Sequence, residues 1–169
     1  FAETFAADNR PEDLAAHLAA TFGLAQQAAE LADPDVVTLL ARRAGELVAY
    51  AQMRRIAPPA CVTQEHAIEL RRFYVDRAAH GSGVARELMA WVHTVARDFG
   101  ARYLWLGVWE RNARAIAFYA KTGFVRVGSH DFFVGPDRQT DHVLLAPVAG
   151  TIDRVTLREI TADTVRAVN

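Results

Sequence analysis

Residues Leu70 to Ala85 read LRRFYVDRAAHGSGVA and place a strand, a glycine-rich turn and the start of a helix in direct succession. Alternate residues of 67–75 share one face, as they do in a β-strand. From Val84 to Phe99 apolar residues recur at helical spacing, and Gly100 stands where a helix C-cap is expected. The stretch therefore predicts an α/β domain in which the turn leads into the helix N-terminus.

The glycine turn has the chemistry of an anion-binding site. A helix N-terminus offers N–H groups without intrahelical acceptors together with the positive end of the helix dipole. Gly81 and Gly83 allow an anion to approach the backbone closely. The turn is not a Walker A motif, because the Lys-Ser/Thr pair is absent, and it lacks the full dinucleotide fingerprint. Alternatively, the two glycines are needed only to form a tight turn. The neighbouring segments are therefore needed to choose between an anion-binding site and a simple turn.

The other elements are predicted from apolar periodicity and turn residues. They are two short helices between Arg10 and Asp33, a hairpin of Val36–Leu40 and Leu47–Met53, a strand at Tyr103–Val108, a helix at Asn112–Thr122, and strands at Phe124–Val127 and His142–Ala146. No linker, repeat or low-complexity tract divides them. Residues 1–150 are therefore expected to form one domain.

Two more blocks follow the turn at ordinary separations. They are Trp105–Asn112, WLGVWERN, and Ala115–Phe124, AIAFYAKTGF. With the turn, they resemble the GNAT superfamily of acyl-coenzyme A dependent N-acetyltransferases over about Val36 to Ala146. Within it, the first block and residues 133–141 are most similar to the bacterial spermidine/spermine N-acetyltransferase subgroup. The resemblance implies an α/β (α+β) GNAT fold, in which helices flank a mixed, mostly antiparallel sheet and two central parallel strands splay apart.

The resemblance also implies a binding site for acetyl-CoA as co-substrate. Main-chain N–H groups of the turn would hold its diphosphate, and the residues concerned are Gly81, Ser82, Gly83, Val84 and Ala85. His80 opens this site in place of the family's usual Arg or Gln. The pantetheine arm would pair like a strand with the backbone from Phe73 to Val75. Asn112 and Tyr119 match family residues that face the cofactor.

Transfer of an acetyl group to an amine needs a stabilised carbonyl oxygen and a proton for the departing thiolate. Tyr119 resembles the family's acid, and the alternative is an aromatic ring packed beside Phe118 and Phe124. The backbone N–H of Val75 is the oxyanion donor that the resemblance implies.

Two carboxylates are candidates for the base that takes a proton from the amine. Glu69 resembles the strand carboxylate that some family members use, and the alternative is a solvated carboxylate paired with Arg71. Glu110, at the end of the 103–108 strand, is its rival and could bind a cationic amine without removing a proton. Water is the third option, so the sequence leaves the base open.

The composition argues against several classes of function. The chain has 169 residues, and its 19 Lys and Arg nearly balance 20 Asp and Glu, so neither nucleic acid nor an acidic membrane is an expected partner. No apolar run approaches the roughly 20 residues of a membrane span. With Cys61 as its single cysteine and six scattered histidines, the chain predicts neither a disulfide nor a metal site, and a cytoplasmic location is expected.

The predicted activity is direct, sequential acetyl transfer from acetyl-CoA to a primary amine. A polyamine or another small amine is the favoured acceptor, and a peptide amine is the other kind. A non-catalytic acyl-CoA sensor is the runner-up, and a homodimer is a further expectation.

The chain end departs from the family's order, because residues 1–150 lack the usual first strand. Residues 151–169 resemble the missing piece, with a strand at Val155–Ile160 and a helix starting at Thr161. Either this segment opens a second domain, or it completes the sheet within the chain or by a swap. We expect Val155–Ile160 to pair with the hairpin of Val36–Met53, with the helix near Phe1 and Phe5, because an exposed apolar edge strand is usually covered.

Overall fold

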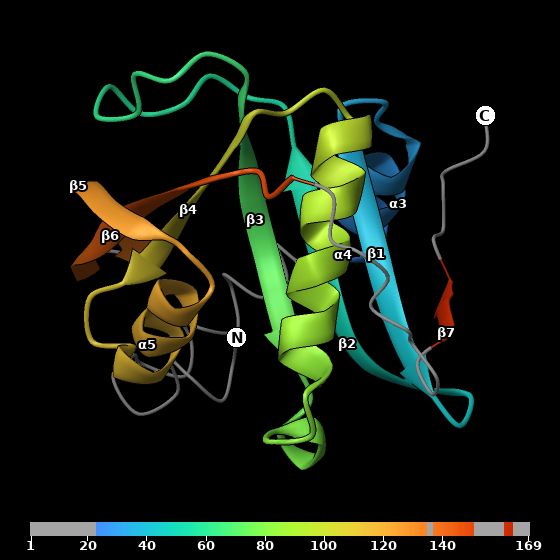
Figure 1. Ribbon diagram of the computed structural model, residues 1–169. Helices are drawn as coiled ribbons and strands as arrows, with labels where there is room; N and C mark the ends of the chain where they lie inside the picture. The colour runs from blue at the N-terminus through green and yellow to red at the C-terminus, as the bar shows by residue number, and fades with distance from the viewer. Residues whose placement is uncertain (1–22, 135–136, 151–160, 164–169) are drawn as a thin grey trace.

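One sheet with strand order β5-β6-β4-β3-β2-β1-β7 runs through the computed structural model, which describes residues 23–134, 137–150 and 161–163 (Figure 1). In chain order the elements are α3 (Leu24–Ala32), β1 (Val36–Arg43), β2 (Glu46–Arg54), β3 (Ala67–Val75), a 3-10 turn (Arg77–Ala79), α4 (Val84–Asp98), β4 (Tyr103–Trp109), α5 (Ala113–Lys121), β5 (Val125–Val134), β6 (Asp137–Pro147) and β7 (Thr161–Asp163). Every neighbouring pair is antiparallel except β3 and β4. The predicted mixed, mostly antiparallel sheet with helices on its faces is confirmed.

The central parallel strands splay, as the resemblance implies. β3 and β4 pair at only three positions, of which Glu69 opposite Trp105 is the last. Beyond it β3 continues to Val75 against β2, and β4 continues to Trp109 against β6. The β2–β3 register shifts once, between Gln52 and Met53, which marks a β-bulge beside the splay. A gap therefore opens between β3 and β4 toward their C-terminal ends.

The larger core lies on the face that α4 covers (Figure 1). Helical spacing along α4 buries one stripe against the sheet, including Val84 and Val92, which are completely buried. Alternate strand residues such as Leu104 and Leu106 meet this stripe. The residues between them face the other way, where Trp105 joins a smaller cluster with Val62, Val143 and Leu145. The sheet thus has an α4 face and an opposite face.

A buried ionic cluster holds α3 on the opposite face. Glu30 is 5% exposed and accepts hydrogen bonds from Arg71 at 2.7 Å and Arg72 at 2.5 Å. Gln26 and Gln52 donate to the same carboxylate. Burial would raise the pKa of Glu30, but these bonds and the Arg72 charge outweigh it and hold the pKa at about 2. The carboxylate is therefore ionised at neutral pH and ties α3 to the sheet.

Two predicted boundaries need correction. Strands were expected at 124–127 and 142–146, but β5 and β6 reach from Val125 to Val134 and from Asp137 to Pro147. The added residues pair in register through His130 and Asp141, and most of them are polar, so the sequence lacks a clear apolar alternation there. Backbone pairing across the hairpin makes them strands.

The chain end differs from the prediction. A helix was expected to start at Thr161, but Thr161–Asp163 form β7, which pairs antiparallel with β1 from Leu40 to Arg42. Pairing with β7 satisfies backbone N–H and C=O groups on the edge of β1. A helix starting at Thr161 would leave these groups of β1 unpaired. The expected strand at 155–160 and the residues Phe1 and Phe5 lie outside the described residues.

Candidate active site

The glycine turn lies where the chain leaves β3 and enters α4. Gly83 is the N-cap of α4 with φ +91°, and Gly81 has φ +79°, so both occupy the left-handed region that favours glycine. The N–H groups of Arg86 and Glu87 bond to the Gly83 carbonyl, so the first turn is regular. The N–H groups before them have no intrahelical acceptor and are placed to bind an anion.

Side chains stabilise the turn from within. Ser82 Oγ donates to the Ala79 carbonyl at 2.6 Å, and Val84 is completely buried in the core. His80 is exposed, and its Nε2 lies 3.1 Å from the Val75 carbonyl oxygen, which accepts a hydrogen bond in the tautomer protonated at Nε2. Unlike a long Arg or Gln side chain, His80 thus connects the turn to the end of β3.

The gap between β3 and β4 starts at Glu69 and widens toward the glycine turn. Phe73 and Val75 lie on the α4 side of β3, where both pack against the larger core. Val75 is six positions beyond Glu69, which is roughly 20 Å of extended chain. A long, thin ligand whose anionic end binds at the turn could therefore extend its other end along β3 toward Glu69.

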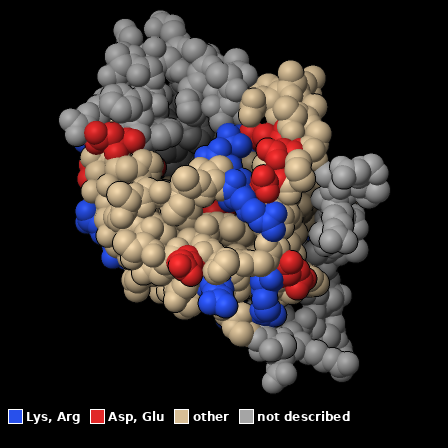
Figure 2. All heavy atoms as spheres, turned by 90° about the horizontal axis from the view of Figure 1, so that it is seen from above, with Lys and Arg blue, Asp and Glu red and all other residues tan. Residues whose placement is uncertain are grey.

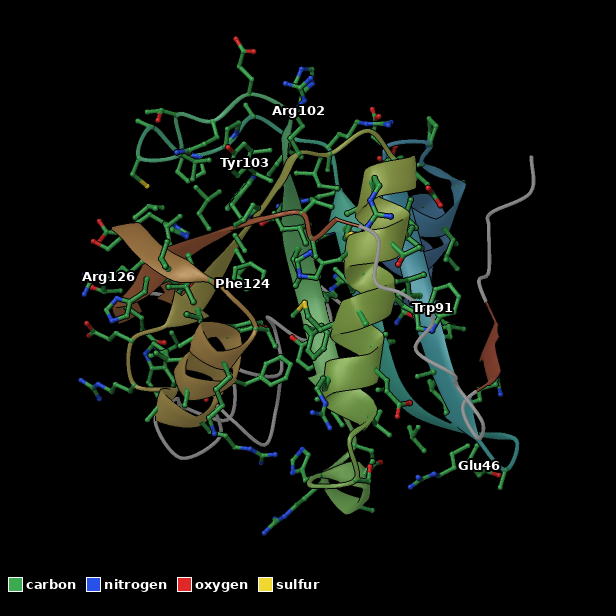
Figure 3. All side chains as sticks on the ribbon, in the orientation of Figure 1. Glu46, Trp91, Arg102, Tyr103, Phe124 and Arg126 are labelled. Atoms are coloured by element: carbon green, nitrogen blue, oxygen red, sulfur yellow. The ribbon has the colours of Figure 1, made fainter. Side chains whose placement is uncertain are left out.

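Tyr119 lies on α5 beside this gap. Its ring centroid is 6.3 Å from that of Phe73 on β3 and 5.5 Å from those of Phe118 and Phe124. Figure 3 shows Phe124 reaching into the space between α5 and α4. Burial raises the pKa of Tyr119 far above its usual value, and nearby Tyr74 adds to the shift. The phenol therefore stays protonated at neutral pH and is suited to donate a proton.

Asn112 is the N-cap of α5. Its side-chain oxygen accepts a hydrogen bond from the Ala115 N–H at 3.1 Å, which satisfies one of the first N–H groups of the helix. The residue follows β4 and so lies at the wide end of the gap.

The two acidic candidates lie apart. Glu69 is at the narrow end of the gap, where it forms an ion pair with Arg54 on β2, and its side chain is 13% exposed. Glu110 is exposed just beyond the end of β4, and its backbone N–H bonds to the Thr140 carbonyl. The turn, Phe73, Val75, Asn112 and Tyr119 therefore gather along the gap, whereas Glu69 and Glu110 lie near its two ends.

Two residues that sequence reasoning missed lie over β4. A Cβ atom added to Gly107 would be 3.0 Å from His130 Nε2 and 3.1 Å from Asp141 Oδ2. Burial raises the pKa of Asp141 to about 6, although the His130 charge lowers it. Asp141 Oδ1 is buried without a hydrogen-bond partner among the described residues. The sequence prediction placed strands only at 124–127 and 142–146, so neither His130 nor Asp141 was assigned to a strand.

The described surface carries charged side chains of both signs (Figure 2). Seen from above, basic and acidic side chains lie next to each other on this side of the molecule, with neither sign dominant (Figure 2). Ranges 23–134, 137–150 and 161–163 contain no group of three His, Cys, Asp or Glu residues placed to hold a metal ion. Of the helices in those ranges, none is long and apolar enough to cross a membrane.

Known proteins share this arrangement. The model of the acetyltransferase (GNAT) family matches residues 2–124. An uncharacterized N-acetyltransferase of Lactobacillus delbrueckii subsp. lactis is 33% identical over 85% of this chain and 83% of its own. Another, from Mycobacterium tuberculosis, is 37% identical over 80% of this chain and 82% of its own.

Solved structures agree in fold. The PaiA N-acetyltransferase of Thermoplasma acidophilum, solved in complex with coenzyme A, superposes with a TM-score of 0.68 at 17% identity, covering 86% of this chain and 84% of its own. The ribosomal-protein-S18-alanine N-acetyltransferase of Escherichia coli gives 0.59 at 19% identity, covering 77% and 80%.

A sheet that opens between two parallel strands, beside a glycine turn at a helix N-terminus, defines a class of acyl-coenzyme A binding folds. With the family and relatives above, the chain belongs to the GNAT family of acetyltransferases. It is an enzyme that transfers the acetyl group of acetyl-CoA to an amine.

Proposed function

We propose that the acceptor is a small primary amine, with a polyamine favoured, and that the acetyl group moves to it directly without a covalent enzyme intermediate. The observation that carries the proposal is the gap between β3 and β4, with the glycine turn at its wide end and buried Tyr119 beside it. Resemblance of the 105–112 block to polyamine acetyltransferases supports the polyamine.

The cofactor-binding residues fit acetyl-CoA by their geometry. The backbone N–H groups of Gly81, Gly83, Val84 and Ala85 would bind the diphosphate, whereas the N–H of Ser82 donates to the Ala79 carbonyl at 3.3 Å. The backbone from Phe73 to Val75 would pair with the pantetheine arm. Acetyl-CoA supplies an activated acyl thioester. With the diphosphate at the wide end, the pantetheine arm and its thioester would extend from the turn into the gap between the two strands.

Three tasks then fall to residues of this chain. The backbone N–H of Val75 would stabilise the carbonyl oxygen as it gains negative charge. Tyr119, protonated at neutral pH, would give its proton to the departing thiolate. Cys61 has no role in direct transfer, since the amine itself is the nucleophile. The third task is to accept the proton of the amine. Glu69, Glu110 and water are the candidates that the sequence leaves open for it.

The test is a panel of amines assayed for thiol release from acetyl-CoA, with cofactor binding followed by calorimetry. We expect turnover with spermidine and other small primary amines, and slower turnover with peptide N-termini. Peptides preferred over every small amine would contradict the proposed acceptor. Tight acetyl-CoA binding with no turnover on any amine would instead support the sensor described above.

A further inference from the structure

The strand row opposite the α4 face holds a carboxylate and an imidazole that the activity described so far does not use. Leu104, Leu106 and Val108 of β4 point into the larger core, so Trp105, Gly107 and Trp109 face the opposite side. In register, Asp141 lies beside Trp109, and His130 lies beside Asp141. Asp141 and His130 therefore share a face with Gly107 and converge over it.

Gly107 borders the gap along which acetyl-CoA is proposed to lie. It is two residues beyond Trp105, the last β4 residue paired with β3, so it borders the inner part of the gap, roughly 7 Å past its narrow end. With no side chain at Gly107, the space over β4 is open to the two polar groups. An amine held there would reach the gap from the face opposite α4.

We propose that Asp141, with His130 beside it, binds the acceptor as a cationic amine over Gly107 and accepts the proton that its ammonium group loses first. The proposal rests on the proposed function and deepens it by assigning the base. Geometry favours Asp141 over the two earlier candidates, because Glu69 is engaged by Arg54 and Glu110 is exposed beyond the end of β4.

The electrostatics of the site agree with this role. A pKa of about 6 for Asp141 leaves the carboxylate largely ionised at neutral pH and more basic than an ordinary aspartate. Among described residues, His130 of β5 is the titratable group whose charge acts on it, and Gly107 and Trp109 of β4 carry no charge. Asp141 Oδ2, which lies over Gly107, can accept a hydrogen bond from an ammonium group, and Oδ1 has no hydrogen-bond partner among the described residues.

The reaction balances with these groups. The ammonium first gives one proton to Asp141, which passes it to solvent. The free amine then forms an N–C bond with the thioester carbonyl carbon, and the C–S bond breaks with its electron pair on sulfur. Tyr119 protonates that thiolate, and the second proton lost by the nitrogen restores Tyr119. The products are the amide, coenzyme A and one released proton.

The experiment compares Asp141→Asn with the wild-type protein, using spermidine as probe if it is turned over and otherwise the best amine of the panel. We expect kcat/KM to fall at least about 100-fold and the low-pH limb of the pH profile, with its apparent pKa near 6, to disappear. The dissociation constant of acetyl-CoA should stay within about twofold. Asp131→Asn is the matched control, because Asp131 is the next residue on β5 after His130 and is exposed.

Two further measurements separate a functional from a structural role. Removing a buried carboxylate whose pKa is raised should leave the melting temperature at pH 7 unchanged or higher, whereas loss of a structural contact would lower it. Gly107→Ala should raise KM for the amine while Asp141 is still present, because the added Cβ meets both polar atoms.

Each outcome has a distinct meaning. An Asp141→Asn protein with wild-type kcat/KM and pH profile would overturn the proposal. The proposal would also be overturned if Asp141→Asn loses activity only in proportion to a lower melting temperature and Gly107→Ala has a normal KM for the amine. A wild-type protein that binds acetyl-CoA but acetylates no amine would overturn the proposed function, and this proposal with it.

Discussion

Tyr119 shows how one residue can serve both packing and chemistry. Its ring packs among Phe73, Phe118 and Phe124, as the structural alternative expects, and its hydroxyl is held in the protonated form by burial. Both interpretations of this residue are therefore compatible with its place beside the gap, and kinetics can separate them.

Tyr119→Phe keeps the ring and removes the hydroxyl. We expect kcat to fall by about 100-fold or more, because the thiolate then leaves without a positioned acid. Affinity for acetyl-CoA, measured by calorimetry, should change little, and so should the melting temperature. Phe118→Leu is a control for packing, and it should lower stability more than Tyr119→Phe does. An unchanged kcat with the chemical step limiting would return Tyr119 to packing alone.

Glu30 of α3 forms buried ion pairs with Arg71 and Arg72 of β3. Glu30→Gln removes the buried carboxylate that binds Arg71 and Arg72, so we expect a loss of about 3–5 kcal/mol in the free energy of unfolding, measured in urea. Because the folded pKa lies below the unfolded one, the wild-type stabilisation is present above about pH 4.5 and is lost as pH falls toward 2. Glu46→Gln in the exposed hairpin turn should change neither quantity.

At the scale of single elements, local motifs were predictable and long-range registers were not. The turn at Gly81–Gly83 and the helix after it follow from neighbouring residues, because φ and capping are local properties. The meeting of His130, Asp141 and Gly107 depends on how β5 and β6 align with β4, and three separated polar or small residues carry no such information. The carboxylate over the gap therefore required the structure.

The turn at the start of α4 offers a matched pair of substitutions. Gly83→Ala places a Cβ at φ +91°, and Gly45→Ala does the same at φ +87° in the β1–β2 hairpin. Neither Cβ would approach a described atom closer than 3.9 Å, so the strain should cost a similar 1–2 kcal/mol, roughly, at both sites.

The two variants should differ in binding. Gly83→Ala redirects the first N–H groups of α4, so acetyl-CoA affinity should fall at least about tenfold, or about 1.4 kcal/mol, whereas Gly45→Ala should bind normally. Equal affinities in calorimetry would show that this turn does not hold the diphosphate.

At the scale of the whole molecule, the chain end contributes to the sheet through β7. The strand–helix interpretation of 151–169 was wrong for Thr161–Asp163, where the unpaired edge of β1 outweighed a local capping signal. We propose that Thr161–Asp163 extends the sheet beside β1.

Deleting residues 151–169 should therefore destabilise the protein or reduce its solubility. Loss of β7 exposes backbone groups of Leu40–Arg42, and a loss of 1 kcal/mol lowers the melting temperature of a chain this size by roughly 2–4 °C. Deleting only 164–169 keeps β7 and should leave the melting temperature unchanged. If the longer deletion leaves both melting temperature and oligomeric state unaltered, the pairing does not stabilise the domain.

The three-residue contact between β3 and β4 also governs how the backbone exchanges hydrogen with solvent. Past Glu69 and Trp105, peptide groups on the facing edges of these strands lack each other as partners. Their amides in the middle of the sheet should exchange nearly as fast as those of an outer strand, while amides between β1 and β2 stay protected. Adding acetyl-CoA should slow exchange selectively along β3. The least protected interior strand would thus be the one most changed by the ligand.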